Sequence, residues 1–328
     1  VIETADRDID DRELQALLDN PVPDGGWWNY VVALVEKYGA VPQSVSTETK
    51  HSSATRRLNG ILNGMARHDA AKLRSMAAEG VAVDELRAAK KEMLADVYRI
   101  LALHFGVPPE EFVWRVKNKD DEIIEKKFTP KSFYKDAVGV DLSEYVTVMD
   151  HPAYEYGKFY RINYCRNFFD AEDMGMLNLG VNEMKELAER AVLDGDPVWF
   201  AADIGKENYG TEGILKVGIY DYDALFGLDR KLTKEQMVTY RHSTPNHAMV
   251  FVGIDRKDDK PVKWLVENSW GTKNGDKGYW AMYDDWFDSY VYTVIVHKRH
   301  VAKNTLKLLD TEPGRIPAWD PMRSAFDE

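Results

Sequence analysis

T-P-N-H-A-M-V-F-V-G-I-D runs from Thr244 to Asp255, and W-L-V-E-N-S-W-G runs from Trp264 to Gly271. Each stretch contains an apolar, β-branched run that is typical of a buried strand. His247 opens the first run and Asn268 closes the second. A turn in the polar segment Asp255–Lys260 would join the two strands into a hairpin. The pattern therefore predicts that His247 and Asn268 meet at one end of a sheet.

An imidazole beside an amide is the base-and-orienter half of a Cys-His-Asn nucleophilic site. The amide oxygen of Asn268 would accept a hydrogen bond from one ring nitrogen of His247 and fix its tautomer, which leaves the other nitrogen to face a thiol. Trp270 would shield this hydrogen bond from water. Ser269 carries a hydroxyl nearby, but it follows Asn268 directly and would point to the opposite face of a strand, so we exclude it as a nucleophile.

The sequence contains one cysteine, Cys165, which rules out an internal disulfide framework and fits a reducing cytoplasm. An activated thiol needs an electropositive site, typically a helix N-terminus beside the base. Cys165 lies instead in Y-R-I-N-Y-C-R-N-F-F, among residues of β type, and we interpret it as an inert core residue. The histidines other than His247 have no cysteine or carboxylate cluster at metal-ligand spacing, so we expect no metal and no cofactor.

The composition excludes several classes of protein. The chain has 328 residues, of which 44% are apolar, enough for a sizeable core. No window approaches the roughly 18 consecutive apolar residues of a membrane span, and no signal peptide is recognisable. A net charge of −12 and a pI of 5.3 argue against a nucleic-acid partner. We expect a cytoplasmic protein without membrane or nucleic-acid partners.

Periodicity along the chain predicts an α+β fold. Stripes of apolar residues at helical spacing occupy the region 50–115. An amphipathic helix over Met184–Val192 precedes a buried strand that starts after Pro197. Two further strand-like runs cover Gly278–Tyr283 and Tyr290–His297. The charged stretch Arg115–Lys127 reads as a solvated hairpin or loop.

Seven motifs spread over essentially the whole chain are shared with one known group of proteins. They are D-G-G-W-W (Asp24–Trp28), E-K-Y-G-A-V-P (Glu36–Pro42), T-P-K-S-F-Y (Thr129–Tyr134), the P-V-W-F and D-I-G-K of Pro197–Lys206, N-H-A-M (Asn246–Met249), V-E-N-S-W-G (Val266–Gly271) and P-A-W-D-P-M (Pro317–Met322). Together they resemble the papain-like cysteine peptidases, and more closely the bleomycin hydrolase and bacterial aminopeptidase C family. N-S-W-G with an upstream H-A is typical of the papain-like peptidases, whereas K-S-F-Y and the P-A-W-D-P-M tail narrow the resemblance to the bleomycin hydrolase and aminopeptidase C family.

The resemblance implies a cysteine aminopeptidase that acts on peptides, with His247 as base and Asn268 as its orienter. It also implies that Gly25 and Gly26 pair with the substrate backbone. Members of the family are mostly homohexamers whose active sites face an internal chamber.

The family's carboxyl-terminal arm lies in the active-site cleft and restricts cleavage to the amino end of peptides. Trp270 and Glu328 complete the substrate-binding residues that we predict, because a carboxylate at the end of the arm could pair with the α-ammonium group of a substrate. After P-A-W-D-P-M, however, this chain continues as R-S-A-F-D-E (Arg323–Glu328), which is longer, more charged and more aromatic than the small residues with which the family usually ends.

The family's nucleophilic cysteine, and the glutamine before it that helps to form the oxyanion hole, lie in an amino-terminal segment. Neither has a counterpart in this sequence, so we expect the nucleophile in a segment upstream of Val1 and expect this chain alone to be inactive. The alternative interpretation is a non-catalytic homologue that serves as a structural or binding subunit.

We therefore expect a papain-like fold, with a helical lobe and an antiparallel β lobe, that lacks its amino-terminal part. In this interpretation residues 1–45 are the remainder of the helical lobe and residues 46–140 are a helical insertion. Residues 141–300 form the β lobe with His247 and Asn268, and residues 301–328 form a helix and an extended arm.

Overall fold

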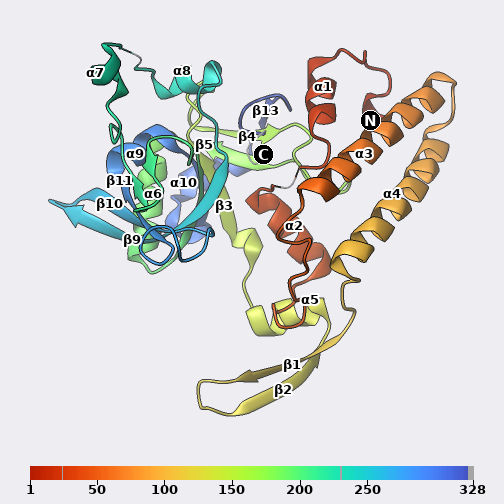
Figure 1. Cartoon of the computed structure of the whole chain (residues 1–328), viewed down its shortest axis with the longest axis horizontal. Helices are drawn as coiled ribbons and strands as arrows, with labels where there is room; N and C mark the ends of the chain where they lie inside the picture. Colours follow the sequence, from red (N-terminus) through yellow and green to blue (C-terminus); the bar gives the residue numbers. More distant parts are fainter. Residues whose placement is uncertain (24, 230, 324–328) are drawn as a thin grey trace. The chain divides into compact units, whose positions relative to one another are not determined.

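The computed structural model describes residues 1–23, 25–229 and 231–323. It divides the chain into two compact units, Val1–Asp141 and Leu142–Glu328 (Figure 1). The division lies next to the expected end of the insertion at residue 140.

Helices make up most of the first unit. α1 (Arg12–Asp19) begins at Asp11, whose carboxylate accepts hydrogen bonds from two backbone N–H groups of the first turn. α2 (Trp28–Tyr38) ends at Gly39, where φ is +85° and a Cβ would lie 2.3 Å from the carbonyl carbon of Pro130. Only glycine fits such a position without strain. The other helices before the hairpin are η1 (Ile2–Thr4), α3 (Arg56–Ala78) and α4 (Val83–Phe105).

A β-hairpin follows the long helices. It pairs β1 (Phe112–Lys117) with β2 (Ile123–Phe128), so the charged stretch forms a hairpin, one of the two structures that the sequence left open. The range 46–140 therefore holds a hairpin as well as helices. Phe112, Phe128 and Phe133 form a small apolar cluster at its base, where the unit continues into α5 (Pro130–Phe133), η2 (Tyr134–Val138) and Asp141.

An eleven-stranded sheet forms the second unit, in the order β13-β4-β5-β3-β12-β6-β9-β10-β11-β8-β7. Most neighbours are antiparallel, while β3 and β5, β4 and β13, and β8 and β11 run parallel. The strands are β3 (Tyr145–Met149), β4 (Lys158–Ile162), β5 (Gly175–Asn178), β6 (Val198–Ala202), β7 (Asn208–Tyr209), β8 (Ile214–Leu215), β9 (His247–Lys257), β10 (Lys260–Glu267), β11 (Tyr279–Tyr283), β12 (Val291–His297) and β13 (Gly314–Ile316). The helices are η3 (Leu142–Glu144), α6 (Val181–Leu193), α7 (Tyr222–Phe226), α8 (Lys234–Thr239), α9 (Asp284–Tyr290), η4 (Lys298–His300), α10 (Lys303–Leu306) and η5 (Lys307–Asp310).

The predicted hairpin is present as β9 and β10. Its two-residue turn consists of Asp258 and Asp259, which have φ values of +51° and +60°. Two positive φ values in succession are the signature of a type I′ turn, whose twist matches that of the flanking strands. The pairing shifts register twice, between Pro261 and Lys263 and between Leu265 and Val266.

The core of the second unit lies between α6 and the sheet. α6 buries its apolar stripe, which includes Met184 and Leu187. Phe200 on β6 and Phe251 on β9 stack with their ring centroids 3.8 Å apart, and both side chains are fully buried. Aromatic pairs of this kind stabilise a core beyond the area that they bury.

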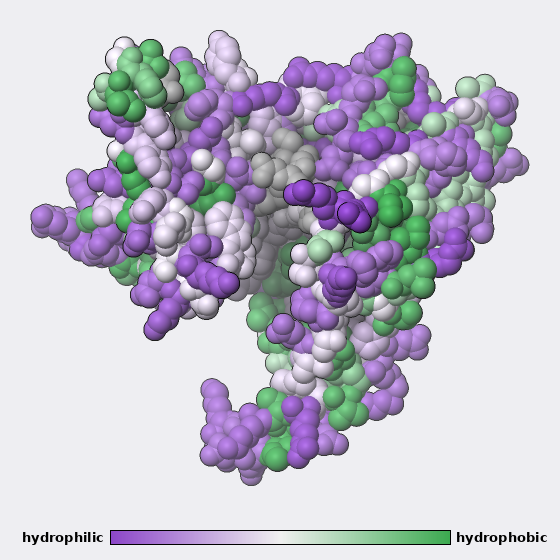
Figure 2. Space-filling model, in the orientation of Figure 1, coloured by the Kyte–Doolittle hydropathy of each residue, from purple (hydrophilic) through white to green (hydrophobic). Residues whose placement is uncertain are grey.

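Apolar side chains are also exposed around α7. Figure 2 shows hydrophobic residues gathered over this helix, where Leu225 is 70% exposed and Phe226 is 64% exposed. The ring of Phe226 stacks on Tyr222, which stacks in turn on Tyr220. None of the helices in the described part of the chain combines the length and the apolar character that a bilayer crossing needs.

The stacked core pair predicts a large effect of truncation. Phe251→Ala should lower the free energy of unfolding by about 3–5 kcal/mol, because it removes a fully buried ring and leaves a cavity. Its neighbour Val252 is exposed, so Val252→Ala should cost less than about 1 kcal/mol. Urea unfolding followed by tryptophan fluorescence measures both. Equal losses in the two variants would contradict the burial of Phe251.

Candidate active site

The strand order fixes which residues share an edge with His247. His247 begins β9 and pairs with Ala202, the last residue of β6. Ala202 also pairs with Val291, the first residue of β12, and β12 in turn pairs with the end of β3 at Met149. We call the edge of the sheet formed by His247, Ala202, Val291 and Met149 the His247 edge.

His247 and Asn268 are joined by a hydrogen bond at this edge. Nε2 of His247 lies 2.9 Å from Oδ1 of Asn268, within the range expected for this pair. Asn268 is buried, and its backbone N–H donates to the carbonyl of Gly278. Since the amide oxygen accepts, Nε2 carries the proton, and Nδ1 of the neutral ring is the basic nitrogen. This tautomer is the one that a base facing a thiol needs.

The aromatic residue Trp270 lies against the imidazole. The two ring centroids are 4.6 Å apart, and the indole itself remains 48% exposed. Burial lowers the pKa of His247 below its ordinary value of 6.5, while the hydrogen bond to Asn268 acts in the opposite direction. The ring is therefore neutral, and able to accept a proton, at neutral pH.

A buried carboxylate that the sequence analysis missed holds the segment in front of His247. Asp203, which is 3% exposed, accepts hydrogen bonds of 2.8 Å from Nδ2 of Asn246 and from Oγ of Ser243. Oδ1 of Asn246 accepts in turn from the backbone N–H of Ile204. The side chain of Asn246 is thus fixed at both ends, and the residue that follows it is His247. The signal in the sequence that could have indicated Asp203 is its position directly after an apolar, strand-like run.

Cys165 lies at the other end of the sheet. Lys158 at the start of β4 pairs with Asn178 at the end of β5, and Asn178 pairs with Met149 at the His247 edge. β4 therefore runs away from this edge, and Cys165 follows its far end. The side chain of Cys165 is fully buried. Both observations agree with the interpretation of Cys165 as a core residue.

The described part of the carboxyl-terminal arm returns to the His247 edge. Oγ1 of Thr244 donates to the carbonyl of Pro321 at 2.7 Å, and Nη2 of Arg241 donates to the carbonyl of Trp319 at 2.8 Å. Ile316 and Ala318 are buried. The arm is therefore docked on its own unit as far as residue 323.

The remaining predicted substrate-binding residues lie in the first unit or outside the described residues. Gly25 and Gly26 precede α2 and belong to the first unit, whereas His247 belongs to the second. Glu328 lies outside the described residues, as does Asp24 of the D-G-G-W-W motif. The roles of Gly25, Gly26 and Glu328 stay predictions.

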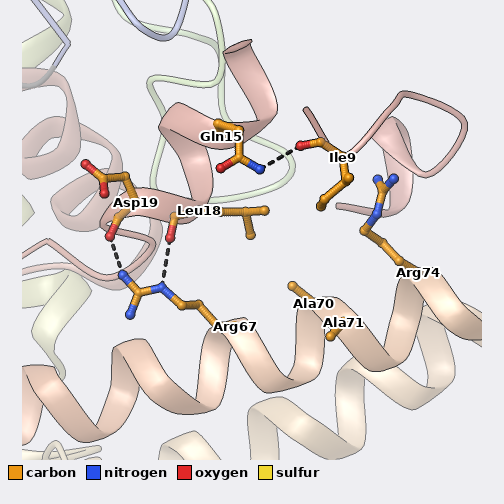
Figure 3. Close-up of a pocket in the computed structure, with 8 residues that line it drawn as sticks. All are labelled: Ile9, Gln15, Leu18, Asp19, Arg67, Ala70, Ala71 and Arg74. Carbon is orange, nitrogen blue, oxygen red and sulfur yellow. Dashed lines mark hydrogen bonds between the residues drawn. The ribbon is translucent and has the colours of Figure 1, made fainter. Parts of the chain in front are cut away.

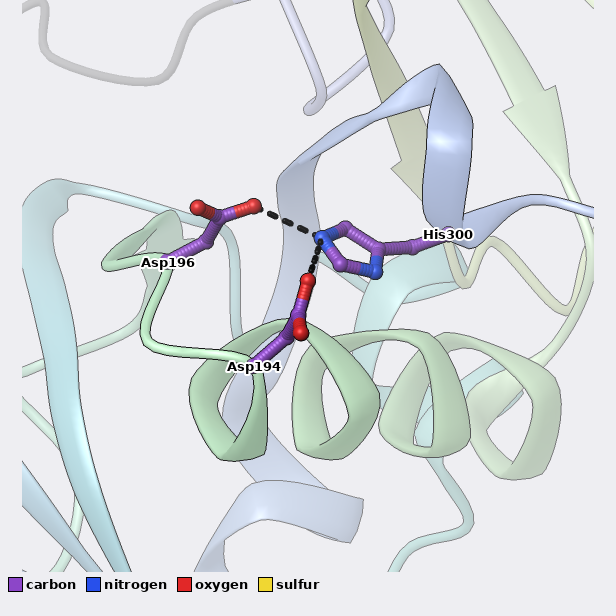
Figure 4. Close-up of side chains that lie close together, drawn as sticks. All are labelled: Asp194, Asp196 and His300. Atoms are coloured by element: carbon purple, nitrogen blue, oxygen red, sulfur yellow. Dashed lines mark hydrogen bonds and ion pairs between the residues drawn. The ribbon is translucent and has the colours of Figure 1, made fainter.

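One group of side chains among the described residues has the composition of a metal site. Asp194, Asp196 and His300 place their ligand atoms within 4.8 Å of one another (Figure 4). The guanidinium of Arg299, however, lies 2.5 Å from Asp196 and 3.3 Å from Asp194. Nε2 of His300 already hydrogen-bonds Asp196 at 2.7 Å. The group fits an ion-pair network that ties the end of α6 to η4.

The first unit contains a pocket of about 380 Å³ beside α1 and α3 (Figure 3). Its cationic side chains are Arg67, which donates to the carbonyls of Leu18 and Asp19, and Arg74, which donates to those of Thr4 and Arg7. Both guanidinium groups thus bind backbone oxygens of their own unit. They fix the segment that carries α1.

Two substitutions should move the pKa of His247 in opposite directions. Trp270→Ala should raise it toward 6.5 by admitting water to the ring, whereas Asn268→Ala should lower it further by removing the acceptor for the charged form. An NMR titration of the histidine ring protons measures the pKa of His247 in both variants. A shift of the same sign in both variants would contradict this geometry.

Since the pKa of His247 in the folded chain lies below 6.5, the unfolded chain binds the proton more readily just below that pH. The contribution of His247 to stability should therefore fall as the pH drops below 6.5.

The chain is similar to known proteins over nearly its whole length. Residues 1–323 match the model of the peptidase C1-like family. The chain is 39% identical to aminopeptidase C of Streptococcus thermophilus, over 99% of this chain and 74% of that protein, and 36% identical to bleomycin hydrolase of Rattus norvegicus, over 95% and 71%. The crystal structure of PepW from Lactobacillus rhamnosis HN001 superposes with a TM-score of 0.95 at 38% identity, covering 98% of this chain and 73% of that one. The expected α+β fold and family are confirmed: the chain belongs to the peptidase C1-like family.

Proposed function

We propose that this chain is the greater part of a cysteine aminopeptidase, with His247 as its general base. The observation that carries the proposal is the hydrogen bond from Nε2 of His247 to Asn268, which leaves Nδ1 as the basic nitrogen of a partly buried ring. Relatives named aminopeptidase C and bleomycin hydrolase at 36–39% identity support the reaction class.

In the proposed reaction, Nδ1 of His247 takes the proton of a thiol, and the sulfur attacks the carbonyl carbon of the peptide bond. His247 then gives that proton to the departing amine, and a thioester remains. Water attacks the thioester while His247 accepts its proton, which releases the acid and returns the thiol. Asn268 keeps the imidazole in one tautomer throughout, and Trp270 shields their hydrogen bond.

We propose that the thiol belongs to a segment outside this sequence. Cys165 is buried at the end of the sheet opposite His247, so this chain supplies no cysteine that could reach the base. The chain alone would then be inactive. The same observation favours the second candidate function, a non-catalytic homologue that acts as a structural or binding subunit.

For the substrate, we propose the amino ends of peptides. Gly25 and Gly26 would pair with the peptide backbone, and the carboxylates at Glu328 would bind the α-ammonium group. The contacts of the arm with Arg241 and Thr244, just before His247, support a role of the tail in this restriction. We further propose a cytoplasmic homo-oligomer, which the resemblance to the family implies is a hexamer, in which the exposed apolar side chains of α7 are covered by another subunit.

A complementation assay tests where the nucleophile lies. This 328-residue chain should not hydrolyse aminoacyl amides, whereas the same chain extended by a segment with the family's glutamine and cysteine should. In the extended enzyme, Asn268→Ala should lower kcat by about 10–100-fold, because the imidazole loses its fixed tautomer. Cys165→Ala, the matched control, should leave kcat unchanged.

Three results separate the alternatives. Turnover by this chain alone that disappears in Cys165→Ala would place the nucleophile at Cys165 and refute the proposal. An extended enzyme that folds but does not turn over would favour the non-catalytic subunit. Turnover of the extended enzyme that resists alkylation of its added cysteine would exclude thiol chemistry.

A further inference from the structure

A buried hydrogen bond between His151 and Asp320 joins the carboxyl-terminal arm to the loop that follows β3. Nε2 of His151 lies 3.2 Å from Oδ1 of Asp320, and the two residues are 1% and 4% exposed. The hydroxyl of Tyr154 donates to Oδ2 of Asp320 at 2.9 Å, and the backbone N–H of Met322 donates to Oδ1 at 2.9 Å. Both carboxylate oxygens are therefore bound, and two of the three donors lie more than 160 residues away in the sequence.

The loop that receives Asp320 is held by residues outside the arm. The side chain of Asn178 accepts from the backbone N–H of His151 and donates to the carbonyls of His151 and Tyr154. The hydroxyl of Tyr156 donates to Asp150 at 2.9 Å, and Lys234 forms an ion pair with Asp150 at 2.6 Å. His151 and Tyr154 are thus preorganised, so little conformational entropy is lost when they bind the arm.

The protonation pattern suits a carboxylate partner. Nδ1 of His151 is buried and has no hydrogen-bond partner among the described residues, so the tautomer with its proton on Nε2 avoids a buried, unpaired N–H group. Burial by itself would raise the pKa of Asp320. The hydrogen bonds that Asp320 accepts from His151, Met322 and Tyr154 outweigh this effect, and the pKa of Asp320 lies below its usual value. Asp320 is therefore ionised where it binds.

We propose that His151 and Tyr154 form a clasp for Asp320, and that this clasp holds residues 317–323 of the arm at the His247 edge. His151, Tyr154 and Asp320 are positioning residues, since they hold the arm in place and act on cleavage specificity through it. Beyond the clasp, the backbone carbonyls of Trp319 and Pro321 accept hydrogen bonds from Arg241 and Thr244. Asp320 is thus the one side chain of P-A-W-D-P-M that supplies a charge to these contacts. The effect on cleavage rests on the proposed function, whereas the docking of the arm does not.

Hydrogen exchange of the arm tests the clasp without any enzymatic activity. In the 328-residue chain, Asp320→Ala should speed amide exchange in peptides covering 317–323 by at least about tenfold, because the arm opens locally. Tryptic cleavage after Arg323 should accelerate in parallel. His151→Ala should act in the same way, and His151→Gln should restore part of the protection through its amide donor. Tyr154→Phe, which removes one donor, should have a smaller effect.

Asp196→Asn is the matched control. It weakens a second histidine–aspartate pair of the same unit, His300 and Asp196 at 2.7 Å, which belongs to the network at the end of α6 and has no hydrogen bond to the described residues 317–323. It should leave exchange of residues 317–323 unchanged, even if the thermal midpoint falls as far as in Asp320→Ala. Equal exchange of the arm in Asp320→Ala and the unsubstituted chain would overturn the clasp. If Asp320→Ala does not fold, hydrogen exchange of residues 317–323 in His151→Gln and Tyr154→Phe tests the clasp instead.

Cleavage specificity tests the consequence in the extended enzyme. Asp320→Ala should raise the rate of internal cleavage of a peptide with a blocked amino end, relative to amino-terminal cleavage of the same peptide with a free amino end, by about tenfold or more, while Asp196→Asn should not. If Asp320→Ala releases the arm but leaves cleavage specificity unchanged, the clasp is supported and the role of the arm in the proposed function is refuted. A protected arm in Asp320→Ala would refute the clasp, whatever the specificity.

Discussion

The hydrogen bond between His247 and Asn268 depends on the register of one hairpin. β9 begins with His247 and β10 ends just before Asn268, so the pair meets only if the turn at Asp258 and Asp259 places the strands in that register. A slip by one residue would send every side chain of one strand to the opposite face. The type I′ turn and the buried rings of the core therefore determine the geometry of the candidate site.

The His247 edge is unusual in concentrating buried polar side chains. Asp150, His151, Asn178, Asp203 and Asp320 are all less than 5% exposed, and each takes part in a hydrogen bond or ion pair. A buried polar group costs free energy unless it has a hydrogen-bond partner. Such a layer therefore favours the one arrangement of its loops in which every group is paired over other loop conformations. The apolar core below gives the sheet its stability, while this polar layer fixes the loops around His247.

The sequence predicted those features that depend on residues close together in the chain. His247 and Asn268 are separated by a single hairpin, and strand periodicity with a polar turn was enough to pair them. Asp203 and the clasp were missed because they join residues 40 to 169 positions apart, and no local pattern carries that information. α9 was missed between two strands because its seven residues are too few to show a helical period. The family resemblance supplied the fold as a whole.

The two register shifts of the hairpin have opposite effects. Lys257 pairs with Lys260 beside the turn and Val250 pairs with Glu267 at the far end, so each strand advances by the same number of residues despite its irregularities. One shift adds a residue to β10 and the other adds a residue to β9, and the two cancel. The chain can therefore lose or gain a residue in this hairpin only in compensating pairs. An unmatched deletion would shift the register of one strand against the other, and the side chain of Asn268 would then face away from His247.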